Sequence, residues 1–209
     1  MNFVLSNNFS EETDKMNKNI ELVRLLDLDD EFIIDLKYAT TDNFTKRNIY
    51  GVNECFLNPG TAQMLIEAKN IFKAKGYEVK VLDAFRPIWA QKILWDIIKD
   101  DDFVASPPSA GDMKNCKSSH LNGMCVDATL VDANGNELLM PTPFDYFGKE
   151  AAFSSLVEDG DAKRNAKLLI DVMESVGFEN YDKEWWHFYD RKHKPVQYLD
   201  YKFTDLLNA

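Results

Sequence analysis

The chain has 209 residues, a length that suits one domain or at most two small ones. Its hydrophobic fraction of 45% is ordinary for a globular protein, and no apolar run approaches the roughly 20 residues of a membrane-spanning helix. The formal net charge of -11 disfavours nucleic acid and anionic membrane surfaces as partners. The 3 cysteines do not suggest a disulfide framework, which fits a reducing compartment.

The first residues are polar and lack a regular spacing of apolar side chains. We predict that residues 1–18 form a flexible leader and that residues 19–209 form the folded domain. The leader has no basic start and only a short apolar stretch, so it does not read as a secretory signal. We therefore expect a cytoplasmic protein, with the periplasm as the alternative if a longer leader has been removed.

A strand, a polar loop and a helix are predicted next. Residues 31–40 (EFIIDLKYAT) have the composition of a strand, which we expect to end near Tyr38. Apolar residues at helical spacing predict a helix at about residues 60–75. Thr61 is its expected N-cap, and Gly76 marks its end.

The middle of the chain alternates between the two types of element. Residues 77–85 (YEVKVLDAF) predict a strand, and residues 86–99 predict a helix with a proline in its first turn. After a loop, residues 123–131 (GMCVDATLV) predict another strand. The Asn134-Gly135 pair that follows is typical of a hairpin turn.

The last third of the chain predicts a helix and a final strand. Residues 164–178 have an amphipathic pattern that ends at Gly177, and residues 185–190 (WWHFYD) predict the strand. Its aromatic residues are expected in the core with one face lining a site, and His193 is expected to be solvated. Because helices and strands mix and a hairpin is present, we predict a single α+β domain with a mostly antiparallel sheet and packed helices.

Two short stretches place polar residues beside predicted strands. His120 and Asp127 belong to SSHLNGMCVD, and Glu184 and His187 are the two ends of EWWH. A catalytic zinc ion takes three protein ligands and leaves one position for water. His120, Asp127 and His187 are candidates for these ligands. Glu184 is then the candidate that accepts the proton of the water. In a regular strand Glu184 and His187 would face opposite sides, so a bulge or a bend is required.

Two other interpretations of the same residues stay open. Cys116 or Cys125 could bind zinc together with His120. The second of these cysteines shares one face of its strand with Asp127. Without a metal ion, His120 would cap a turn, and His187 would pack in an aromatic cluster.

These stretches carry a family resemblance. SSHLNGMCVDATL resembles the Ser-x-His-x-x-Gly-x-Ala-x-Asp motif of the VanX-type D-alanyl-D-alanine dipeptidases, which are zinc peptidases of the M15 class. EWWH resembles their Glu-x-x-His motif, and DLKYATTDNFTKRNIYG, DAFRP and FDYF resemble further segments in the same order. The resemblance covers about residues 30–190. This sequence departs from the motif at Cys125, where the family has alanine.

The resemblance implies a metal site and its catalytic partners. His120, Asp127 and His187 would bind one zinc ion. Glu184 would activate the zinc-bound water as a general base and then protonate the leaving amine. Arg86 would hydrogen-bond the substrate carbonyl oxygen and stabilise the oxyanion. Without the family, a surface salt bridge is the expected role of Arg86.

Further residues would bind the two ends of the substrate. The resemblance implies that Ser118 binds the C-terminal carboxylate, and that Tyr38 and Asp145 recognise the ammonium end. Without the family, Ser118 and Asp145 read as turn residues, and Tyr38 reads as a core residue.

The activity that the resemblance implies is hydrolysis of the dipeptide D-Ala-D-Ala to two D-alanines, on a fold shared with the Hedgehog signalling domain. Such an enzyme would remove a cell-wall precursor, in glycopeptide resistance or in dipeptide recycling. The alternatives are a peptidoglycan D,D-carboxypeptidase or endopeptidase and a non-catalytic zinc-binding domain of the same fold. A homo-oligomer also stays open.

Overall fold

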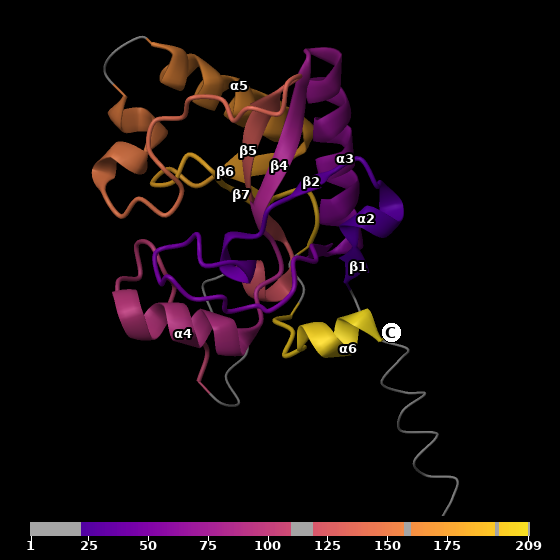
Figure 1. The fold of residues 1–209 in the computed structure, drawn as a ribbon, viewed down its shortest axis with the longest axis vertical. Helices are drawn as coiled ribbons and strands as arrows, with labels where there is room; N and C mark the ends of the chain where they lie inside the picture. The colour runs from indigo at the N-terminus through magenta and orange to yellow at the C-terminus, as the bar shows by residue number, and fades with distance from the viewer. Residues whose placement is uncertain (1–21, 110–118, 157–159, 195–196, 209) are drawn as a thin grey trace, which may run out of the picture.

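The computed structural model describes residues 22–109, 119–156, 160–194 and 197–208 (Figure 1). These residues form one domain of mixed α+β structure. The leader that we predict at residues 1–18 lies outside the described part of the chain. Among the described residues, no helix is both long and apolar enough to span a membrane.

A five-stranded sheet runs through the domain. Its strands, in their order across the sheet, are β2 (Ile33–Ile34), β4 (Tyr77–Asp83), β5 (Cys125–Asp132), β7 (His187–Asp190) and β6 (Phe178–Asn180). β2 runs parallel to β4, and the other neighbouring strands are antiparallel. The predicted α+β class with a mostly antiparallel sheet is therefore confirmed.

Helices and short segments surround this sheet. The helices are α2 (Leu25–Leu28), α3 (Pro59–Ala74), α4 (Ile88–Ile98), α5 (Asp161–Val176) and α6 (Phe203–Leu207). A two-stranded sheet pairs β1 (Val23–Arg24) with β3 (Phe56–Leu57). Single turns of 3-10 helix lie at Lys37–Ala39, Ser119–Asn122, Lys149–Ala151 and Phe153–Ser155.

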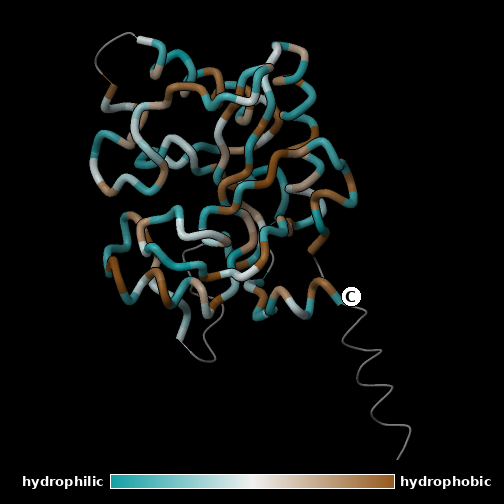
Figure 2. The backbone as a smooth tube through the Cα atoms, in the orientation of Figure 1, coloured by the Kyte–Doolittle hydropathy of each residue, from teal (hydrophilic) through white to brown (hydrophobic). Residues whose placement is uncertain are grey.

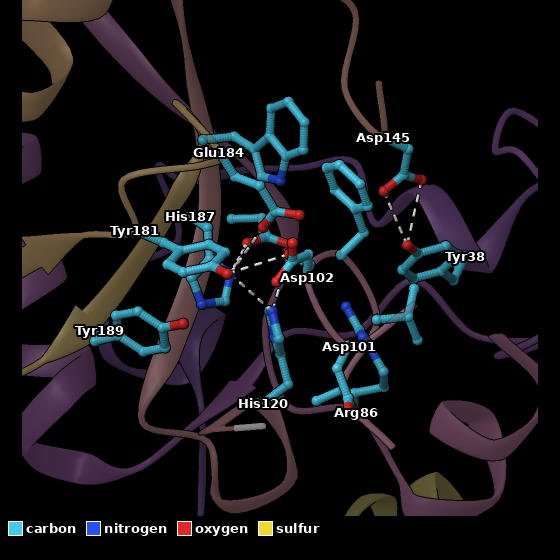
Figure 3. A pocket seen from close by; sticks show the side chains of 15 residues that line it. Tyr38, Arg86, Asp101, Asp102, His120, Asp145, Tyr181, Glu184, His187 and Tyr189 are labelled. Atoms are coloured by element: carbon cyan, nitrogen blue, oxygen red, sulfur yellow. Dashed lines mark hydrogen bonds and ion pairs between the residues drawn. The ribbon is translucent and has the colours of Figure 1, made fainter. Parts of the chain in front are cut away.

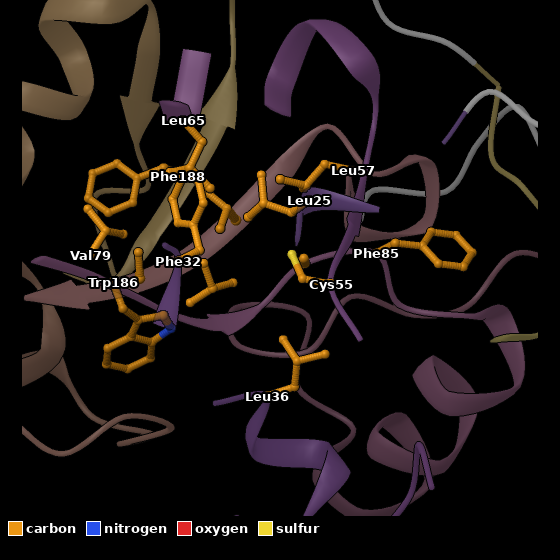
Figure 4. Close-up of a cluster of buried hydrophobic side chains, with 14 of the residues drawn as sticks. Leu25, Phe32, Leu36, Cys55, Leu57, Leu65, Val79, Phe85, Trp186 and Phe188 are labelled. Atoms are coloured by element: carbon orange, nitrogen blue, oxygen red, sulfur yellow. The ribbon is translucent and has the colours of Figure 1, made fainter. Parts of the chain in front are cut away.

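The main core lies between the sheet and helices α3 and α5, which pack against each other (Figure 1). Successive strand residues point to opposite faces of the sheet, and one face turns its apolar side chains to these helices. Figure 4 shows Leu65 of α3, Phe188 of β7 and Val79 of β4 in this core. Figure 2 shows the hydrophobic stretches on the central strands. Burying each such side chain contributes about 1.5–3 kcal/mol.

The opposite face of the sheet carries polar residues, and a β-bulge in β4 aligns them. Val81 pairs with Ala128, but the register then shifts so that Asp83 pairs with Asp127. The extra residue is Leu82, which would otherwise lie opposite Asp127. The bulge therefore puts two buried carboxyl groups on one face, and bulges are common beside active sites.

The strand that we predict at residues 31–40 is much shorter in the structure, and this prediction is wrong in its extent. Only Ile33–Ile34 pairs with β4. The backbone N–H of Asp35 still donates to the carbonyl oxygen of Val81 at 3.0 Å, but that of Leu36 leaves the sheet and donates to the side chain of Asn53 at 2.9 Å. Tyr38 consequently lies in a 3-10 turn, where its ring is buried.

The predicted N-cap of α3 is also wrong. The Asn58 side chain caps the helix by accepting a hydrogen bond from the backbone N–H of Gly60 at 3.0 Å. The Thr61 hydroxyl instead donates to the buried carboxylate of Asp190 at 2.6 Å. Nδ1 of His193 lies 2.9 Å from the same carboxylate, so His193 is anchored beside α3, while its side chain stays exposed as expected.

The other predicted elements agree with the structure. β4, α4, β5, α5 and β7 form where the sequence predicts them. Gly177 ends α5 in the left-handed conformation, with φ 114. A turn forms at Asn134-Gly135, but the chain returns with only an isolated bridge between Val131 and Glu137.

Candidate active site

Two histidines and an aspartate converge on the polar face of the sheet. His120 lies in the 3-10 turn before β5, and Asp127 lies within β5. His187 is the first residue of β7 and pairs directly with Asp127 across the sheet. All these side chains are buried. The structure therefore brings together the ligand trio that the sequence predicts.

The spacing of the three side chains suits a tetrahedral metal ion. Nε2 of His120 lies 3.3 Å from Nδ1 of His187 and 3.4 Å from Oδ2 of Asp127. Nδ1 of His187 lies 2.7 Å from Oδ1 of Asp127. Two ligand atoms that each lie about 2.0–2.1 Å from a tetrahedral zinc ion are about 3.3 Å apart. Two of the separations match this value, and the third needs an opening of a few tenths of an ångström.

The His120 ring is oriented by the backbone. Its Nδ1 lies 2.7 Å from the carbonyl oxygen of Ala84, so the Nδ1 N–H donates there and Nε2 stays available. Outer hydrogen bonds of this kind are usual for metal-binding histidines. Asp83 also lies near the ring, but its carboxylate accepts hydrogen bonds from Tyr50 and Arg86. Asp83 is therefore the partner of an arginine rather than a metal ligand.

The electrostatics of the trio favour a bound cation. Burial favours the neutral acid, but the positive charges of His120 and His187 outweigh it and hold the pKa of Asp127 well below its usual range. Burial opposes the charged ring of His187, but Cys125 and Asp127 raise the pKa of His187 to about 10. A metal ion can replace the protons that the two histidines would otherwise hold.

Glu184 approaches the trio from a turn. The backbone N–H of His187 lies 3.3 Å from the carbonyl oxygen of Glu184, so the two residues close a turn immediately before β7. Because Glu184 lies in a turn outside the strand, its side chain can face the same site as His187 without a bulge in β7. Oε2 of Glu184 lies 3.9 Å from Nδ1 of His187. Burial raises the pKa of Glu184 to about 7, although the charge of His187 opposes this shift.

Arg86 lies buried beside His120, so the surface salt bridge considered for it is wrong. Its Nε and Nη2 groups donate to Oδ2 of Asp83 at 2.9 and 2.6 Å, and Nη1 donates to Gln91 at 2.8 Å. Burial opposes the charge, but Asp83 raises the pKa of Arg86 well above its usual value. Sequence reasoning missed Asp83 and Gln91. The Asp-x-x-Arg spacing in DAFRP was the available signal.

Tyr38 and Asp145 form a second pair across the site from the histidines (Figure 3). The Tyr38 hydroxyl lies 3.0 and 3.2 Å from the two carboxylate oxygens of Asp145. Burial, reinforced by the charge of Asp127, raises the pKa of Asp145 well above its usual range. In the described part of the chain, no lysine or arginine forms an ion pair with this carboxyl group. It is a half-buried acid that faces the cavity, where a cationic partner could bind.

A cavity of about 180 Å³ joins these groups. Its walls include the histidine-aspartate trio, Glu184, Arg86 and the Tyr38–Asp145 pair. Tyr181, Tyr189 and the segment 101–105, which sequence reasoning did not single out, complete them. Trp186 also lines the cavity, as expected for one face of the aromatic cluster. Ser118, the predicted carboxylate-binding residue, lies outside the described residues.

Of the two cysteines in the described part of the chain, Cys125 is the one that lies at the site. It is fully buried, with 0% of its surface exposed, and shares the polar face of β5 with Asp127. Burial works against its ionisation, but His120 and His187 lower the pKa of the Cys125 thiol to about 7. The other candidate, Cys116, lies outside the described residues.

Comparison with known proteins gives the class. Residues 18–206 match the family described as Peptidase M15, D-ala-D-ala dipeptidase. The chain belongs to this family, and it is an enzyme of the peptidase class.

Individual relatives agree with this family. The chain is 33% identical over 174 residues to the D-alanyl-D-alanine dipeptidase of Escherichia coli (strain K12), which covers 83% of this chain and 86% of the relative. It is 30% identical over 182 residues to the D-alanyl-D-alanine dipeptidase of Enterococcus faecium, which covers 80% of this chain and 90% of the relative. Among solved structures, the LdcB LD-carboxypeptidase is similar with a TM-score of 0.43 and 21% identity, over 82% of this chain and 68% of that chain.

Proposed function

We propose that this peptidase hydrolyses the free dipeptide D-Ala-D-Ala to two D-alanine molecules, with one zinc ion held by His120, Asp127 and His187. The observation that carries the proposal is the convergence of these side chains with the Glu184 carboxyl group in one small cavity. The names of the relatives that are 33% and 30% identical support the choice of dipeptide.

The donor set fits zinc. It combines two imidazole nitrogens with one carboxylate, a mixture that catalytic zinc sites use, and their spacing is close to that of tetrahedral ligands. A zinc ion held there would lower the pKa of a bound water molecule to about 7 and polarise the peptide carbonyl group. The hydrogen bond from His120 to Ala84 supports this by aiming Nε2 at the other two ligands.

Glu184 moves the proton. It accepts a proton from the attacking water as the water oxygen bonds to the peptide carbonyl carbon. It then donates this proton to the nitrogen of the leaving amine as the C–N bond breaks. A pKa of about 7 suits both steps near neutral pH. Glu184 lies close enough to His187 for its carboxylate to reach a water at the open position.

Arg86 stabilises the charge that develops on the carbonyl oxygen. A guanidinium group has five N–H donors. The bonds to Asp83 and Gln91 use three of them, which leaves two for a substrate oxygen. Because those bonds hold the group in place, little reorganisation is needed when the oxyanion forms.

Asp145 and Tyr38 receive the ammonium end of the dipeptide. A cation beside Asp145 would supply the positive charge that this half-buried acid lacks and lower its pKa. Ser118 is proposed to bind the carboxylate at the other end. Ligand pockets usually enclose about 300–1,000 Å³, so a cavity of about 180 Å³ favours a very small substrate. This favours the dipeptide over a peptidoglycan chain as the substrate.

The test is the release of D-alanine from D-Ala-D-Ala, with and without a metal chelator. We expect release by the untreated protein, loss with the chelator, and recovery when zinc is added back. N-acetyl-D-Ala-D-Ala, which has no ammonium group, is the matched control and should be cleaved far more slowly. Equal cleavage of the acetylated dipeptide would contradict the ammonium pocket. Full activity after complete removal of the metal would contradict the zinc-dependent reaction.

A further inference from the structure

We infer that Cys125 is a fourth protein ligand of the metal ion and binds it from the interior side of the site. The resting centre would then hold one thiolate, two imidazoles and one carboxylate. The inference rests on the proposed function for the presence of a metal ion, and goes beyond it in the number and kind of ligands.

The position of Cys125 on its strand is the first support. Cys125 and Asp127 are two residues apart on β5, so both side chains point to the polar face of the sheet. Asp127 pairs with His187 and Cys125 pairs with Tyr189, one step further along β7. The thiol therefore lies beside the trio, on the same face of the sheet as Asp127.

The distances are the second support. Sγ of Cys125 and a ring nitrogen of each of His120 and His187 all lie within 4.8 Å of one another, and all three residues are buried. Zinc binds sulfur at about 2.3 Å and nitrogen at about 2.0 Å, so tetrahedral sulfur and nitrogen ligands lie about 3.5 Å apart. With 4.8 Å as the upper bound on these separations, the side chains would have to close around the ion by at most about 1.3 Å.

The surroundings of Cys125 differ from those of an ordinary core cysteine. Cys55 belongs to the hydrophobic core cluster, whereas Cys125 is fully buried but outside that cluster. An alanine at position 125 would also fit the strand, but only the thiol of a cysteine adds an atom that can bind a metal ion. Among the described residues, His120, Asp127 and His187 line the cavity but Cys125 does not.

This arrangement leaves room for the reaction. Because Cys125 does not line the cavity, its sulfur would reach the ion from the side away from the substrate. Four protein ligands fill a tetrahedral centre, so the attacking water would bind on the cavity side as a fifth ligand, which zinc can accept during a reaction. A thiolate is also a soft ligand, which favours zinc and cobalt over magnesium or manganese.

Cobalt(II) in place of zinc provides a readout that does not depend on activity, because a bound thiolate adds a sulfur-to-cobalt charge-transfer absorption in the near ultraviolet. We expect this band in the wild-type protein and in Cys116→Ser. We expect Cys125→Ala to lose the band but keep the visible cobalt absorption of the remaining ligands. Its zinc affinity, measured by competition with a chelator, should fall by at least roughly 10- to 100-fold, the range for loss of outer partners of a metal site.

Other outcomes overturn the inference. A wild-type protein that binds one cobalt ion without the band has no thiolate ligand, and the proposed function then stands with three ligands. A band that persists in Cys125→Ala and disappears in Cys116→Ser would assign the thiolate to the other cysteine. A folded wild-type protein that takes up neither zinc nor cobalt would overturn both the inference and the proposed function.

Discussion

The hydroxyl of Tyr38 lies 3.0 and 3.2 Å from the two carboxylate oxygens of Asp145, a residue that follows it by 107 positions. Asp145 adopts the left-handed conformation, with φ 59, and its carboxyl group is half-buried beside the Tyr38 ring. Burial makes the charged form of this acid unfavourable until a cation arrives. The same feature that suits Asp145 to an ammonium group therefore weakens the free protein.

Asp145→Asn should separate stability from activity. Burial raises the folded-state pKa of Asp145 above its unfolded value of about 3.9, so the wild-type protein loses stability as the pH rises from about 4 through the folded-state pKa. Asparagine does not ionise, and it tolerates the left-handed conformation. The variant should therefore have a higher free energy of unfolding than the wild type at pH 7, and a smaller advantage at pH 4. Urea unfolding at pH 4 and pH 7 checks whether the difference grows with pH.

The same variant should lose activity. Hydrogen bonds to charged groups contribute about 1.5–3 kcal/mol, so kcat/KM for D-Ala-D-Ala should fall at least about tenfold with zinc content unchanged. Asp171→Asn is the matched control, because Asp171 is exposed on α5 and pairs with Lys167. An Asp145→Asn protein with wild-type kcat/KM would contradict the role of Asp145 in substrate binding.

Tyr38→Phe should remove the hydrogen-bond donor that Asp145 has in the free protein. A fully buried acceptor left without its donor costs about 1–3 kcal/mol of stability, and the half-buried carboxyl group of Asp145 should show the lower end of this range. In the Asp145→Asn background the same substitution should cost less, because no ionisable acid remains. The unfolding free energies of the two single variants and the double variant measure this coupling. Additive losses would mean that the Tyr38 hydroxyl acts independently of Asp145.

Arg86 should have separable structural and catalytic roles. Arg86→Ala leaves the carboxylate of Asp83, which is 0% exposed, without its cation and should destabilise the protein by about 3–5 kcal/mol. Adding Asp83→Asn removes the unpaired charge and should restore most of the stability. Turnover should stay low in the double variant, because the charge that stabilises the oxyanion is still absent. A stable double variant with near-normal kcat would reduce Arg86 to a structural role.

The sequence predicted the fold best where short-range patterns decide the structure. Alternation along β5 puts Asp127 on one face and Val126 on the other, and helical spacing predicts α5 and its end at Gly177. The prediction from sequence failed where one extra residue shifts the pairing register of two strands. The bulge at Leu82 brings Asp83 opposite Asp127, and no residue type in this segment indicates a bulge.

The candidate site was predictable only through its motifs. His120, Asp127 and Glu184 are recognisable because the family motif fixes their spacing. The contact between Tyr38 and Asp145 depends on how distant segments pack, and spacing along the chain does not encode it. The turn at Glu184 is closed by a hydrogen bond from the backbone N–H of His187 to the carbonyl oxygen of Glu184. The strand propensity of this segment does not predict such a turn.

The most direct test of the reaction is Glu184→Gln, with zinc content and kcat measured on the same preparation. Glutamine keeps the size of the side chain but cannot accept the proton, and general acid-base catalysis contributes about 10² to 10⁴ in rate. We expect one zinc ion per chain, a normal fold and a loss of kcat at or above the upper end of that range. Glu179→Gln, at an exposed glutamate paired with Arg191, should behave as the wild type. A Glu184→Gln protein that binds zinc and turns over D-Ala-D-Ala at a near-normal rate would contradict the account.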